Sequence, residues 1–80
     1  MYYVYILKSI KFSNQIYIGF TRNIDKRISH HNSGSSPHTS KYKPWSIVTY
    51  HVFVDRIKAI AFERYLKSCS GRALIAKRFL

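Results

Sequence analysis

Three stretches of the chain alternate between the two sides of an extended backbone, as β-strands do. They are residues 2–8, 15–21 and 46–54. The first is apolar on both sides, with Tyr3, Tyr5 and Leu7 alternating with Val4 and Ile6, which predicts a central strand. In the second, Ile16, Ile18 and Phe20 share one face and Tyr17 points to the other. The third is rich in β-branched and aromatic residues, which favour strands.

A helix is expected directly after the second strand. Asn23 is a suitable N-cap, and Asp25 lies in the first turn, where the helix dipole favours a negative charge. The helix should end near Asn32. Residues 33–44 then read as a long polar loop, and long loops in small domains often carry function.

Two more helices are expected after the third strand. Asp55 should cap a helix over residues 56–68, which Ser70 and Gly71 should interrupt, and a last helix should follow over residues 72–79. This order, β-β-α-β-α-α, predicts an α+β fold in which helices cover a small sheet.

The composition is that of one small folded domain, residues 1–80, with 46% hydrophobic and 16% aromatic residues. A single cysteine, Cys69, excludes an internal disulfide and a cysteine-based zinc cluster, so we expect a cytoplasmic protein. The apolar N-terminal stretch is too short to span a bilayer, and no membrane association is expected.

Positive charge dominates the composition. Fourteen lysines and arginines face three acidic residues, for a net charge of +11. Because the basic residues are spread along the chain and not gathered in a tail, they indicate a folded surface for nucleic acid. The alternative is a small protein that charge merely keeps soluble. Lys41, Tyr42, Lys43 and Trp45 mix charge with aromatic rings as nucleic-acid surfaces do, although Trp45 is equally explained as a core residue.

Glu63 is the acidic residue without a capping role, since Asp25 and Asp55 lie at helix starts. It falls in the middle of a helix beside the apolar face, where it should be partly sheltered. It either pairs with an arginine or binds a divalent cation. The histidines His30, His38 and His51 lack the spacing of metal ligands, and we expect them to be solvated or to fill a strand.

Tyr5 and Tyr17 lie inside adjacent strands, so their hydroxyl groups can meet above one face of the sheet. Arg27 and His31 are four residues apart and share one helix face. A phenol beside Arg27 is expected to have a pKa far below its ordinary value of about 10, and would then act as a general base. Gly19 should let the backbone turn without a side chain in the way.

Together these residues resemble the GIY-YIG nuclease domain, and in particular small stand-alone members similar to the N-terminal nuclease domain of the excision-repair nuclease. The elements that carry the resemblance are Tyr3-Val4-Tyr5, Tyr17-Ile18-Gly19, Arg27, His31 and Glu63. Each is weak alone, but the ordered set is specific.

The resemblance implies a three-stranded antiparallel sheet flanked by helices and a phosphodiesterase that uses one divalent cation, Mg²⁺ or Mn²⁺. It assigns the metal to Glu63, the phosphate to Arg27, and the positioning or activation of water to Tyr5 and Tyr17. His31 matches an assisting histidine. Which tyrosine is the base stays open.

We therefore predict a structure-selective endonuclease acting on DNA, with RNA as the alternative polymer, in DNA repair or recombination. A protein partner is compatible with this interpretation. Five basic residues are expected to contact nucleic acid: Lys26, Lys41, Lys43, Arg64 and Lys67. Because Tyr3 stands where the first motif has glycine, and no asparagine follows the Glu63 helix, an inactive nucleic-acid-binding module of the same fold is the rival interpretation.

Overall fold

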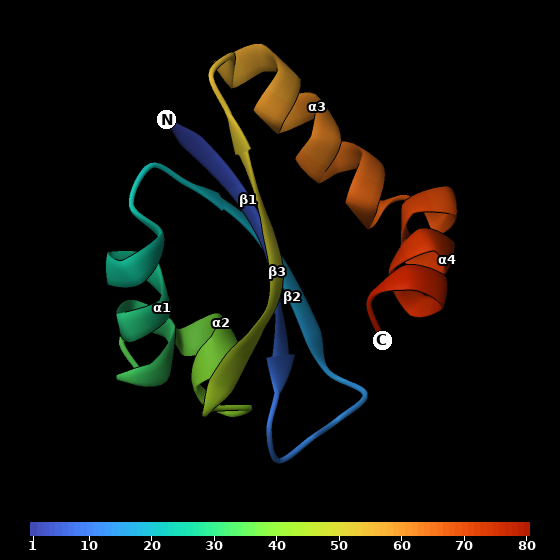
Figure 1. Cartoon of the computed structure of the whole chain (residues 1–80). Coiled ribbons are helices and arrows are strands. Elements are labelled where there is room, and N and C mark those ends of the chain that lie inside the picture. Colours follow the sequence, from blue (N-terminus) through green and yellow to red (C-terminus); the bar gives the residue numbers. More distant parts are fainter.

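The computed structural model describes all 80 residues, and helices cover both faces of its sheet (Figure 1). The elements in chain order are β1 (Tyr2–Ser9), β2 (Ile16–Thr21), α1 (Ile24–Asn32), α2 (Pro37–Ser40), β3 (Trp45–Phe53), α3 (Arg56–Lys67) and α4 (Cys69–Arg78). Helices α1 and α2 lie on one face, and α3 and α4 lie on the other.

The sheet has three strands in the order β2-β1-β3, and both neighbours run antiparallel to β1. The predicted central position of the first strand and the antiparallel sheet are thus confirmed. Tyr5 pairs with Gly19 on one side and with Tyr50 on the other. This register places Tyr5 at the middle of the sheet.

The alternation along β1 divides the core into two apolar clusters, one on each face. Val4 and Ile6 pack with Ala59, Leu66 and Ile75 beneath α3 and α4. The cluster on the α1 face is built from Tyr5, Leu7 and Trp45, against which Ile24 and Ile28 of α1 pack. Trp45 is only 4% exposed, so it serves the core, as one of its two interpretations held.

The region read as a continuous polar loop contains a helix. Pro37 begins the short helix α2, where its restricted φ suits the first helical position. Thr39 of this helix is buried, and the indole N–H of Trp45 donates to its carbonyl at 3.0 Å. The alternation of apolar and polar residues cannot show a single helical turn held in place by such a contact.

The last helix begins earlier than expected, and the predicted interruption at Ser70 and Gly71 is wrong. Ser68 separates the two helices instead: it is the C-cap of α3, and its hydroxyl accepts the Gly71 amide of α4 at 3.2 Å. Gly71 lies inside α4 because a methyl group there would overlap the backbone of Tyr65 and Leu66. This glycine therefore allows close packing at the junction of α3 and α4 and does not break the helix.

None of the four helices is long and apolar enough to cross a bilayer.

Candidate functional site

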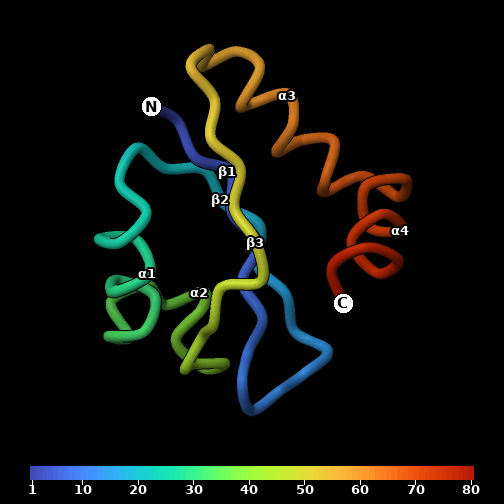
Figure 2. The backbone as a smooth tube through the Cα atoms, viewed as in Figure 1, coloured from blue at the N-terminus to red at the C-terminus, as the bar shows by residue number.

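The site depends on the tight turn that sends the chain from β2 back alongside the sheet as α1 (Figure 2). The Thr21 hydroxyl accepts the Asn23 amide at 3.1 Å, and the Asn23 side chain accepts the Lys26 amide at 3.0 Å. Asn23 is thus the N-cap, as predicted, and α1 ends at Asn32 as predicted. Because Ile24 and Ile28 face the core, the residues between them face the rim of the sheet.

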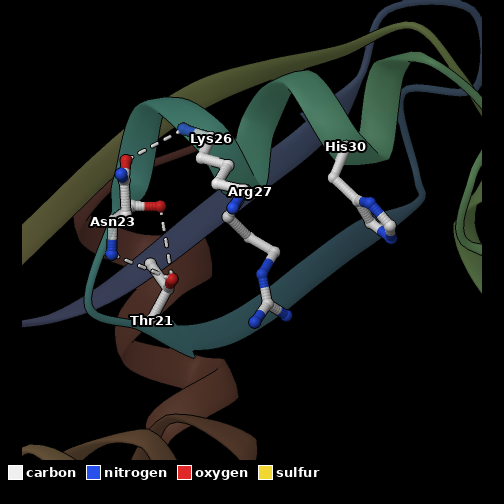
Figure 3. A pocket seen from close by; sticks show the side chains of 5 residues that line it. All are labelled: Thr21, Asn23, Lys26, Arg27 and His30. Atoms are coloured by element: carbon white, nitrogen blue, oxygen red, sulfur yellow. Dashed lines mark hydrogen bonds between the residues drawn. The ribbon is translucent and has the colours of Figure 1, made fainter.

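A polar hollow of about 390 Å³ opens between α1 and β2. Its lining contains no hydrophobic residue: Thr21, Asn23, Lys26, Arg27 and His30. Figure 3 shows the Arg27 side chain and the His30 ring descending from α1 toward β2. Two permanent cations with no acidic residue among them suit an anion such as a phosphate group.

Arg27 and Lys26 were expected in a site, whereas His30, Thr21 and Asn23 were not. His30 lies three residues beyond Arg27 and so shares its helix face, which is a sequence relation that pointed to it. Thr21 and Asn23 enter the hollow because the turn that they build forms one of its walls.

Behind this hollow, three buried side chains form a hydrogen-bonded chain. The Tyr5 hydroxyl lies 3.0 Å from Nε2 of His31, and Nδ1 of His31 lies 2.9 Å from Oγ1 of Thr39. All three residues are at most 2% exposed. Burial, together with the nearby positive charges of Arg27 and His30, lowers the pKa of His31. The imidazole is therefore neutral, with one nitrogen donating and the other accepting.

The expectation of a low phenol pKa is wrong for Tyr5. Burial, reinforced by the Tyr17 hydroxyl and the Glu63 carboxylate, raises its pKa above the ordinary value, and Arg27 opposes this only in part. The reason is that Tyr5 is fully buried, whereas Arg27 is exposed. Tyr5 therefore keeps its proton.

Gly19 serves this tyrosine and not a turn. It lies within β2 opposite Tyr5, and a methyl group at this position would overlap the end of the Tyr5 ring. The expected role in turning the backbone is thus corrected: Gly19 provides the space in which the phenol reaches His31.

Tyr17 meets Tyr5 on the α1 face, as predicted. Its ring centre lies 6.2 Å from that of Tyr5 and 4.7 Å from that of His31. Unlike Tyr5, Tyr17 is only half-buried and lines a second hollow, between β2 and α2. Of the two tyrosines, it is the one that a bound molecule can touch.

Glu63 lies on α3, which covers the opposite face of the sheet. Its side chain is 20% exposed, and Oε2 accepts from Nζ of Lys67 at 3.3 Å. The expected ion-pair partner was an arginine, so that interpretation is corrected to a lysine one helical turn away. Because Lys67 is largely exposed, such a pair contributes at most about 1 kcal/mol.

A divalent cation at Glu63 would have a single carboxylate ligand. No three histidine, cysteine, aspartate or glutamate side chains come together anywhere in the structure. A partly open carboxylate in a weak ion pair suits Mg²⁺, which keeps several waters and takes its other ligands from phosphate oxygens. Zinc, which needs more protein ligands, does not fit here. The donor set is thus compatible with the implied ion.

The five predicted basic residues do not form one patch. Lys26 lies in the hollow of Arg27, Lys41 lies in the second hollow, and Lys43 is exposed nearby. Arg64 and Lys67 are on α3, and Lys67 pairs with Glu63. Thr39, by contrast, was not expected in any site, because its burial depends on the docking of α2.

Comparison with known proteins adds family evidence to this geometry. The profile of the GIY-YIG catalytic domain matches residues 1–76. The structure-specific endonuclease subunit SLX1 homolog of Drosophila mojavensis is 41% identical over 71 residues, covering 78% of this chain but 23% of that protein. The chain is also 41% identical to slx1 of Xenopus laevis over 69 residues, 24% of that protein. It therefore spans about a quarter of these SLX1 proteins.

Smaller relatives match over most of their length. UPF0213 protein CPE1444 of Clostridium perfringens is 38% identical over 68 residues, which cover 84% of this chain and 71% of that protein. The solution NMR structure of UPF0213 protein BH0048 from Bacillus halodurans has a TM-score of 0.58 and 28% identity, covering 99% of this chain and 87% of the other. From the profile match, these relatives and the shared fold, the chain belongs to the GIY-YIG nuclease family.

Proposed function

We propose that this chain is a divalent-metal-dependent endonuclease that hydrolyses DNA phosphodiester bonds and selects its substrate by structure. The observation that carries the proposal is the polar, cationic hollow of Arg27 next to the paired tyrosines Tyr5 and Tyr17. The SLX1 relatives are named as structure-specific endonuclease subunits, which supports selection by structure and a protein partner. We place the activity in the cytoplasm, in DNA repair or recombination.

Arg27 and Lys26 bind the scissile phosphate, and Arg27 offsets the charge that develops on it. Tyr17 meets the attacking water because it is the accessible tyrosine of the pair. Tyr5 keeps its proton and holds His31, whose ring supports that of Tyr17 from behind. Tyr5 and His31 are thus positioning residues in this proposal.

Glu63 would hold Mg²⁺ or Mn²⁺. When bound, such an ion neutralises charge on the phosphate and makes a bound water more acidic. The ion pair with Lys67 keeps the Glu63 side chain in place without burying it. Replacing this pair with a cation therefore has a small energetic cost.

The test is nicking of branched, damaged and plain DNA duplexes by the purified chain with Mg²⁺ or Mn²⁺. Arg27→Gln should lower cleavage by about 100-fold or more while the fold persists, because the guanidinium acts on charge in the transition state. Arg78→Gln, which removes the same charge at the far end of α4, is the matched control and should cleave like the wild type.

Glu63→Gln separates metal binding from DNA binding. Cleavage should be lost while DNA affinity is kept, since the amide does not hold a hard cation. Asp25→Asn changes the charge equally and is the control. If the wild type binds DNA but cleaves none of the substrates with either ion, the proposal fails in favour of an inactive binding module.

A further inference from the structure

A second hollow, of about 500 Å³, lies between the start of β2 and the α2 segment, and the proposed cleavage chemistry does not use most of it. Aromatic rings stand around it: Tyr17 lies 6.3 Å from His38 and 6.4 Å from Trp45, and Tyr42 lies 6.5 Å from Trp45, between ring centres. Its volume is in the range of small-molecule sites.

The charge of this hollow favours an anionic ligand with a flat ring. Lys41 lies at its rim, with Nζ 5.7 Å from the centre of the Tyr42 ring, and no acidic residue lines the hollow. Flat aromatic walls beside a cation match a nucleotide, whose base stacks and whose phosphate is attracted by the lysine.

The two hollows are close enough for one nucleic-acid strand to reach both. Tyr17 lines the second hollow and Thr21 lines that of Arg27, and the two residues are four apart on β2, or about 13 Å. Both point to the α1 face. Between them lies Gly19, which has no side chain to obstruct a strand that follows β2.

We propose that the second hollow binds an unpaired nucleobase next to the phosphate held by Arg27. This inference rests on the proposed nuclease function and explains how the domain selects structure. A base inside an intact duplex is stacked and paired, so it enters only at an unstacking cost, whereas a base at a junction or single-stranded end is free to enter.

The lone tryptophan makes the hollow directly observable, because Trp45 fluorescence should change when a base stacks nearby. The probes are a short oligothymidylate, a blunt duplex of equal length and inorganic phosphate, all without divalent metal. The wild type should respond to the oligothymidylate and not to phosphate alone. Tyr42→Leu should weaken oligothymidylate binding by about fivefold or more, as expected for one lost stacking partner, and change duplex binding by less than about twofold.

His38→Ala is the second variant, because Tyr42 also packs against Trp45 and its replacement can disturb the fold. His38 is exposed, so this variant should fold and show the same selective loss. Tyr65→Leu, on the exposed side of α3, is the matched control and should bind all probes like the wild type.

Equal losses on single strand and duplex in His38→Ala, or a wild-type response reproduced by inorganic phosphate alone, would overturn the inference. Since binding is measured without metal, the result is independent of cleavage. Selective binding in a protein that never cleaves would refute only the proposed nuclease. Cleavage by a protein whose single-strand affinity is insensitive to both variants would refute only the nucleobase site.

Discussion

Replacing Thr39 with valine tests whether the buried chain Tyr5–His31–Thr39 supports the site. The substitution keeps the β-branched shape and removes only the hydroxyl group. Nδ1 of His31 then loses its partner at 2.9 Å, and no solvent replaces it, because His31 is 2% and Thr39 1% exposed.

The expected loss of stability follows from that burial. A buried polar group left without a partner costs about 1–3 kcal/mol. For a domain of this size, about 2 kcal/mol corresponds to a decrease in melting temperature of roughly 8–16 °C. The valine adds no compensating apolar burial, since it has nearly the same volume as threonine.

Thermal unfolding followed by circular dichroism measures the loss, and nitrogen chemical shifts of the His31 ring report where its proton resides. Thr39→Ser keeps the hydroxyl group and should preserve both the His31 signature and most of the stability. Thr49→Val, at a half-buried position on β3, is the control for exchanging threonine with valine. A Thr39→Val protein that melts within about 2 °C of the wild type with unchanged His31 shifts would refute the reasoning.

Three further outcomes are expected. Gly19→Ala should displace the Tyr5 ring and break its bond to His31, so its melting temperature should fall by at least as much as that of Thr39→Val; an unchanged value would contradict the close contact at Gly19. Stability should fall as the pH drops below 6.5, because burial lowers the pKa of His31 in the folded state and the unfolded chain then takes up more protons, and it should fall again above pH 10.0, because burial raises the pKa of Tyr5; urea unfolding across pH would show a flat profile if this were wrong. DNA affinity should decrease log-linearly with salt, with a slope of about −0.9 for each phosphate contacted, and a salt-independent affinity would exclude the electrostatic surface.

Short-range features of the sequence were sufficient for most of the fold. Strand alternation placed Tyr5 and Tyr17 on one face, and the caps Asn23 and Asp55 set the starts of α1 and α3. These features work because side-chain direction and capping depend on residues only a few positions apart. The juxtaposition of Arg27 with the tyrosines followed from the same rules.

Tertiary structure decided what depends on burial and on distant partners. Tyr5 and His31 are 26 residues apart, and the pKa of Tyr5 rises because the folded core removes water from it more effectively than Arg27 attracts its charge. Thr39 is buried only because α2 docks against Trp45, through a contact that no periodicity encodes. Local periodicity therefore determined which faces meet, whereas the electrostatic state of the groups between them was decided by packing, since desolvation depends on every neighbour at once.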